Sequence, residues 1–269
     1  MNSLLATLPP LVVTSIVIFL PALLLLAFGA FFRRYTDQWE HEERGFTKMS
    51  THWHKAFITA FLVGESSAIL AGFLSQWNIY AVLIFAILGY SLSFSSYTDI
   101  IEHKAPKEIA RWSIVTLIPI AVVALIDNGL YVIASSQNFI LRLPYFPVSP
   151  DLSMQQLVAF GVWMIIPIVM LLVSGGGLGM ADIRLFVLFA VGLSWWVGIM
   201  AMFTAFFIAN VIQALSFIPA KKYNWGHMVT LKSGKQKRAM PFIPALSVTF
   251  MLMGFYMLPH TLTGIPLPF

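Results

Sequence analysis

Residues 79–97 read IYAVLIFAILGYSLSFSSY and contain no charged side chain. As an α-helix this run is about 28 Å long, close to the roughly 30 Å hydrocarbon layer of a bilayer. The whole chain of 269 residues is 59% hydrophobic and 10% charged, with a mean hydropathy of +0.84, which leaves too little polar surface for a water-soluble domain. Seven further apolar runs are found at 8–32, 56–74, 109–126, 154–173, 182–192, 196–218 and 242–258. The sequence therefore predicts an all-α polytopic integral membrane protein with about eight transmembrane helices.

The two least regular runs need separate interpretation. The first ends at Arg33 and Arg34 without a small-residue cleavage site, so we interpret it as a retained helix and not as a signal peptide. The run at 182–192 is short for a span, which predicts a segment that enters the membrane partway or joins the next one through a kink.

Basic residues divide unequally between the two sides of such a bundle. When the runs alternate across a bilayer, 15 of the 16 Lys and Arg residues lie in loops on one side, and only Arg142 lies on the other. The positive-inside rule makes that side the cytoplasm and predicts both termini outside. The net charge of +5 is thus a topology signal, and no nucleic-acid partner is expected.

Four acidic residues lie in or beside the apolar runs, where a charge is costly and usually has a function. Asp127 is followed by Asn128-Gly129, which predicts a solvated turn. Glu65 lies among small residues inside its run, which favours a structural or proton-linked role. Asp99 follows the end of the run at 79–97, where the helix dipole disfavours a negative charge, and Asp182 begins a helix. The alternating topology places Asp99 and Asp182 at the same cytoplasmic edge.

A glycine-rich stretch precedes Asp182. Residues 174–179 read SGGGLG, with four glycines in six positions. Backbone of this kind at membrane depth is tolerated mainly where it is buried in protein or lines a water-filled cavity, and it could let an extended peptide approach. A flexible packing hinge is the alternative. If the two carboxyl groups meet, one retains a proton while the other deprotonates an attacking water, as in an aspartic protease.

Three motifs in this order resemble those of the type IV prepilin peptidases and preflagellin peptidases, membrane aspartic proteases of the GxGD type. Residues 97–106 (YTDIIEHKAP) are similar to the first-aspartate motif, and 177–185 (GLGMADIRL) to the GxGD motif. Residues 240–246 (MPFIPAL) resemble the family's Pro-Phe-x-Pro segment. The resemblance covers 79–258, which is most of the chain.

The resemblance implies a GxGD-type helical bundle and a site. Asp99 and Asp182 would be the catalytic pair, and the substrate-binding loop would comprise Gly177, Gly179, Ala181, Pro244, Ala245 and Leu246. Residues 1–78 would form an N-terminal helix pair with a short cytoplasmic loop, and 79–260 the catalytic part of a single membrane domain. The implied activity is that of an aspartic endopeptidase in the plasma membrane of a prokaryote. It would remove the short basic leader from prepilin-like, pseudopilin or preflagellin-like precursors at the cytoplasmic face.

The chain departs from the family in two respects. Ala181 replaces the second glycine of GxGD, and its methyl group is tolerated only if that residue does not need a positive φ. Many bacterial members also methylate the new N-terminus and carry a cysteine-containing insert between their first two helices. This chain has no cysteine and only a short connection there, so we expect no zinc site and no cofactor and find no support for methyltransferase activity. His52 and His54 are two positions apart and point in different directions on a helix, which argues against a metal site.

Two alternatives stay open. The chain would be a catalytically inactive homologue that acts in pilus or secretion assembly if Ala181 impairs the site. It would be a small transporter if the glycine break and the buried acids form a binding site at the membrane midplane, although transporters of that design show internal repeats, which we do not find.

Overall fold

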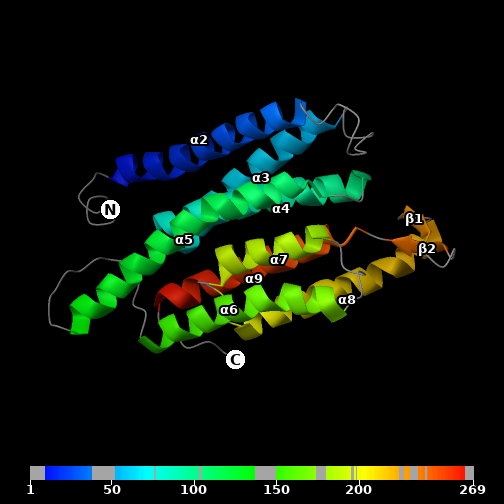
Figure 1. Cartoon of the computed structure of the whole chain (residues 1–269). Helices are drawn as coiled ribbons and strands as arrows, with labels where there is room; N and C mark the ends of the chain where they lie inside the picture. Colours follow the sequence, from blue (N-terminus) through cyan, green and yellow to red (C-terminus); the bar gives the residue numbers. More distant parts are fainter. Residues whose placement is uncertain are drawn as a thin grey trace.

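The computed structural model describes the chain in segments separated by short gaps. These are residues 10–37, 52–75, 77–102, 105–136, 150–173, 180–194, 197, 199–223, 227–230, 236–239 and 241–263. Figure 1 shows elongated helices that run roughly along one direction, with the small β-hairpin beyond one end of the bundle. The helices are α2 (Pro10–Asp37), α3 (Trp53–Leu74), α4 (Ile79–Glu102), α5 (Lys107–Ser136), α6 (Pro150–Val173), α7 (Met180–Leu193), α8 (Ile199–Tyr223) and α9 (Ile243–Thr263).

Every predicted apolar run coincides with one of these helices, but several helices extend further than expected, and two of these extensions include Asp99 and Asp127, respectively. Helix α4 continues past Tyr97 to Glu102, so Asp99 lies inside the helix and not after it. Helix α5 continues to Ser136, so the turn predicted at Asp127 is wrong. A glycine costs a helix only about 1 kcal/mol, and the apolar residues that follow Gly129 continue it.

The prediction of an all-α fold needs one small correction. Between α8 and α9, in the loop predicted to be basic and cytoplasmic, β1 (His227–Thr230) and β2 (Gln236–Ala239) form an antiparallel hairpin. The β-branched Val229 and Thr230 favour a strand there. The helices were predicted from the length of apolar runs. A short polar hairpin contains no such run, so it could not be predicted in this way.

Three helices of the described chain are long and apolar enough to cross a membrane, at Trp53–Leu74, Ile79–Glu102 and Ile199–Pro219. Shorter apolar stretches lie in α2, α6, α7 and α9. A polytopic membrane protein is therefore supported, whereas the number of eight spans remains a prediction from sequence.

The short helix α7 turns back into α8. The Phe186 ring lies 5.3 Å from that of Phe206, while only residues 194–198 separate the end of α7 at Leu193 from the start of α8 at Ile199. The two helices are therefore antiparallel and form a helical hairpin. The antiparallel arrangement contradicts the predicted kink that would continue α7 into α8, whereas a segment that enters the membrane only partway stays a prediction.

Small residues bring α2, α3 and α4 close together. A Cβ atom added at Gly64 of α3 would lie 3.0 Å from the carbonyl oxygen of Ala86 and 3.1 Å from Cβ of Tyr90, both on α4, and 2.8 Å from Leu25 of α2. Lipid is as apolar as a leucine side chain, so helices in a membrane associate mainly through such close van der Waals packing.

We expect Gly64→Val to lower the stability of the folded protein by about 1–3 kcal/mol, because backbone atoms of α4 leave no room for the side chain. The midpoint of thermal unfolding in detergent measures this effect. Gly161→Val in α6 is the matched control, since a Cβ at Gly161 meets nothing within 4 Å. Equal midpoints for the two variants would contradict the packing described for Gly64.

Aromatic side chains fill the part of the core that lies between α6, α7 and α9. Trp163 of α6, Phe186 and Phe189 of α7 and Phe250 of α9 are fully buried. The rings of Phe189 and Phe250 stack with their centroids 4.1 Å apart. These contacts hold α7 against α9 and fix how far along each other the two helices lie.

Candidate active site

Asp99 lies in the last turn of α4 and is 7% exposed. Its Oδ2 atom accepts a hydrogen bond of 3.1 Å from the backbone N–H of Ile243, the first residue of α9. The two residues are 144 positions apart in sequence. The bond thus joins the first of the three sequence motifs to the third.

This hydrogen bond explains how a carboxyl group is accommodated at the end of α4. The C-terminal turn of a helix carries partial negative charge, while the N-terminus of α9 offers unpaired N–H groups and partial positive charge. Pro244, the next residue of α9, has no N–H to offer. Asp99 therefore caps α9 from another helix, with Ile243 as the donor.

The residues around this bond differ in their surroundings. Ser96 of α4 donates a hydrogen bond of 3.2 Å to Ser247 of α9 one turn away. Pro244 and Ala245 are partly buried, whereas Leu246 is fully buried in the core together with Leu185 of α7. Of these three predicted residues, Pro244 lines an apolar groove between α3, α4 and α9.

The GxGD-like motif lies only partly within the described residues. Gly177 and Gly179 fall outside them, and for Asp182 the helix position is described but the side chain is not. Ala181 is the second residue of α7, where the backbone is helical. An alanine methyl group causes no strain in this conformation, since alanine is the most favourable residue in a helix.

The packing of α7 on α9 nonetheless places the start of α7. Phe189 stacks on Phe250, and Leu193 lies against Gly254, an offset of 61 positions in both contacts. The two helices therefore run parallel, and the same offset sets position 182 level with Ile243. Because Ile243 binds Asp99, α7 begins at the end of the bundle where Asp99 lies.

An apolar groove begins beside Asp99. It has a volume of about 440 Å³ and lies between α3, α4 and α9. Its lining includes Ile100 and Pro244 next to the Asp99 end, and Val248, Leu252 and Phe255 further along α9.

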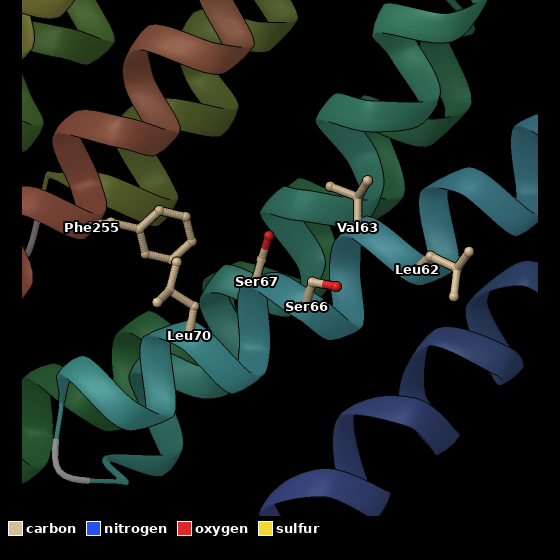
Figure 2. Close-up of a pocket in the computed structure, with 6 residues that line it drawn as sticks. All are labelled: Leu62, Val63, Ser66, Ser67, Leu70 and Phe255. Carbon is tan, nitrogen blue, oxygen red and sulfur yellow. The ribbon is translucent and has the colours of Figure 1, made fainter.

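A second hollow of about 240 Å³ shares Val63, Ser67 and Phe255 with this groove. Figure 2 shows it between α3 and α9, with the Phe255 ring close to Leu70 and Ser67. The two hollows together extend the apolar surface along the bundle, away from Asp99.

One contact near the site could not be predicted from the sequence. The hydroxyl of Tyr97 lies 3.4 Å from Nδ1 of His52, which precedes α3. This contact ties the start of α3 to the Asp99 end of α4. Within the described part of the chain, no three His, Asp or Glu side chains are grouped so as to hold a metal ion.

Comparison of the chain with protein-family models, with curated proteins and with solved structures finds no match. The sequence motifs and the geometry around Asp99 are therefore the observations that bear on function.

Proposed function

We propose that the chain is a membrane aspartic endopeptidase similar to the prepilin and preflagellin peptidases. The observation that carries the proposal is the hydrogen bond from Ile243 to Asp99, together with the start of α7 at the same level. The first and third motifs are thus in contact, and α7, which carries part of the second, begins at the same end of the bundle, as a shared active site requires. The substrate would be a prepilin-like or pseudopilin precursor whose basic leader precedes a hydrophobic helix.

Catalysis would follow the general scheme of a carboxyl pair. The ionised carboxylate takes a proton from water, which attacks the scissile carbonyl carbon, while the protonated carboxyl group donates a hydrogen bond to the carbonyl oxygen. Asp99 and Asp182 are the two groups. Interacting carboxyl groups titrate as a unit, so the roles of acid and base belong to the pair.

The apolar groove supports the same proposal. A leader peptide is cut next to a hydrophobic helix, so an enzyme of this kind needs an apolar surface that adjoins its carboxyl groups. The groove starts beside Asp99 at Ile100 and Pro244 and continues along α9. With the basic loops on the cytoplasmic side, the leader would be cut at the inner surface of the membrane.

The helical backbone at Ala181 bears on the alternative of an inactive homologue. The second glycine of the GxGD motif would be indispensable only if that residue needed a positive φ or if another group had to approach its backbone closely. In this chain Ala181 lies in the first turn of α7, so the replacement introduces no backbone strain. This observation favours an active enzyme.

The proposal is tested by leader cleavage. The chain is co-expressed with an epitope-tagged prepilin-like substrate, and the mature form is detected by its mobility and by sequencing its N-terminus. Cleavage at the junction of leader and helix would support the proposal. Unprocessed substrate in the presence of membrane-inserted protein would count for the inactive or transport interpretations.

The Ile243 N–H can be tested separately from the Ile243 side chain. We expect Ile243→Pro to cleave about fivefold more slowly than Ile243→Ala, because only the proline removes the hydrogen bond to Asp99, which is worth on the order of 1 kcal/mol. Proline is tolerated in the first turn of a helix, so α9 is expected to persist. The initial cleavage rate in purified membranes is the measurement. Equal rates for both variants would remove this bond from the mechanism.

A further inference from the structure

A carboxyl group that the proposed mechanism does not use lies inside the membrane-spanning part of the bundle. Glu65 is near the middle of α3, an apolar helix at Trp53–Leu74 that is long enough to cross the bilayer. Both carboxyl oxygens are enclosed, and neither has a hydrogen-bond partner among the described residues.

The surroundings of Glu65 supply no positive charge within the described part of the chain. Its neighbour Gly64 packs against Leu25 of α2 and Tyr90 of α4. Tyr90 is the titratable side chain at that contact, and its hydroxyl also has no partner among the described residues. Residues 18–30 of α2 contain no ionisable side chain, and the next basic residue of that helix, Arg33, comes eight positions after Leu25, about 12 Å along the axis. Residues 243–259 of α9 contain Tyr256 and no Asp, Glu, Lys, Arg or His.

Helix α3 itself has no basic residue near Glu65. Its nearest basic residue is Lys55, ten positions earlier, which corresponds to about 15 Å along the helix axis. An ionised carboxylate so far from a countercharge, in a medium that cannot solvate it, is strongly disfavoured, and such a group becomes neutral instead.

We propose that Glu65 is a proton-binding site within the membrane: its side chain is an un-ionised carboxylic acid, open to covalent modification by a lipid-soluble carbodiimide. The bound ligand is a proton. The residue as a whole is partly exposed on an apolar helix, so a reagent dissolved in lipid can reach the carboxyl group once a rotation of the side chain uncovers its oxygens.

The modification uses the proton that the proposal assigns to Glu65. One nitrogen of the carbodiimide takes the carboxyl proton, and a carboxyl oxygen adds to the central carbon to form an O-acylisourea. The acyl group then migrates from oxygen to nitrogen and leaves a stable N-acylurea. No group departs, so the peptide gains the mass of one whole reagent molecule, and an ionised carboxylate lacks the proton that the first step needs.

The test uses the full chain in phospholipid vesicles, treated with dicyclohexylcarbodiimide at neutral pH and mapped by peptide mass spectrometry. We expect the adduct at Glu65 and its absence in Glu65→Gln, which matches the acid in shape. Glu108 is an internal control, because it is buried but lies 3.8 Å from the Lys107 ammonium and is expected to stay unmodified.

A water-soluble carbodiimide with an added amine separates the two states of Glu65. Amide formation at Glu65 with this reagent, and none with the hydrophobic one, would show a carboxyl group in contact with water, where solvent supplies the proton for the first step. That result would overturn the proposal. A second readout does not depend on reagent access: the infrared carbonyl band of un-ionised carboxylic acids should be weaker in Glu65→Gln than in the parent by the contribution of one group. Identical bands in the two proteins would also overturn it.

Discussion

Replacing either Asp99 or Asp182 with asparagine is expected to reduce leader cleavage at least about a hundredfold, the range in which general acid and base groups contribute. Each replacement keeps the size of the side chain and removes the group that exchanges a proton with water. At position 99 the asparagine carbonyl oxygen can still accept the Ile243 N–H, so the cap of α9 is preserved. The loss should therefore be one of chemistry and not of folding.

The measurement is the ratio of mature to unprocessed substrate when wild type and variants accumulate equally in the membrane. Glu102→Gln is the matched control, because it removes a carboxyl group from the same end of α4, one turn from Asp99. We expect this control to cleave at the wild-type rate. Either aspartate variant that keeps that rate would show that the two residues are not the catalytic pair.

The helices were predictable because each depends on a local property of the sequence. An apolar run of sufficient length has few options other than a helix in a membrane, since every backbone N–H and carbonyl group must be satisfied within the segment. The run at 56–74 ends where α3 ends, at Leu74, and the run at 79–97 begins where α4 begins, at Ile79. The other end of each helix lies three to five residues beyond the run. The error at Asp127 came from treating a turn-forming tripeptide as decisive within a long apolar helix.

The site was less predictable, because its geometry depends on contacts between distant segments. Charge and topology assigned Asp99 to the edge of the membrane, which stays a prediction, and placed it after a helix that in fact includes it. The donor to Asp99 is a backbone N–H, and nothing in the identity of Ile243 indicates it. The offset of α7 against α9 arises from the stacking of Phe189 on Phe250, and a sequence pattern shows only that both residues are apolar.

Blocking the apolar groove should impair cleavage of a full precursor by about tenfold or more while leaving the carboxyl groups intact. Val248 lines the groove and is 55% exposed, so a tryptophan at this position can project into it without disturbing the core. The substrate helix would lose its apolar contact surface, and each factor of ten corresponds to about 1.4 kcal/mol. Leu172→Trp in α6 is the control, because Leu172 is 75% exposed and does not line the groove.

A second substrate distinguishes an obstructed groove from a damaged active site. A soluble peptide that carries the basic leader and the cleavage site but lacks the hydrophobic helix does not need the groove. We expect Val248→Trp and the parent to cut this peptide at equal rates, while the variant needs a higher concentration of the full precursor to reach half of its maximal rate, as loss of a binding contact requires. If Val248→Trp slows both substrates alike, the tryptophan acts on the carboxyl groups. If it slows neither, the hydrophobic helix of the substrate lies elsewhere on the bundle.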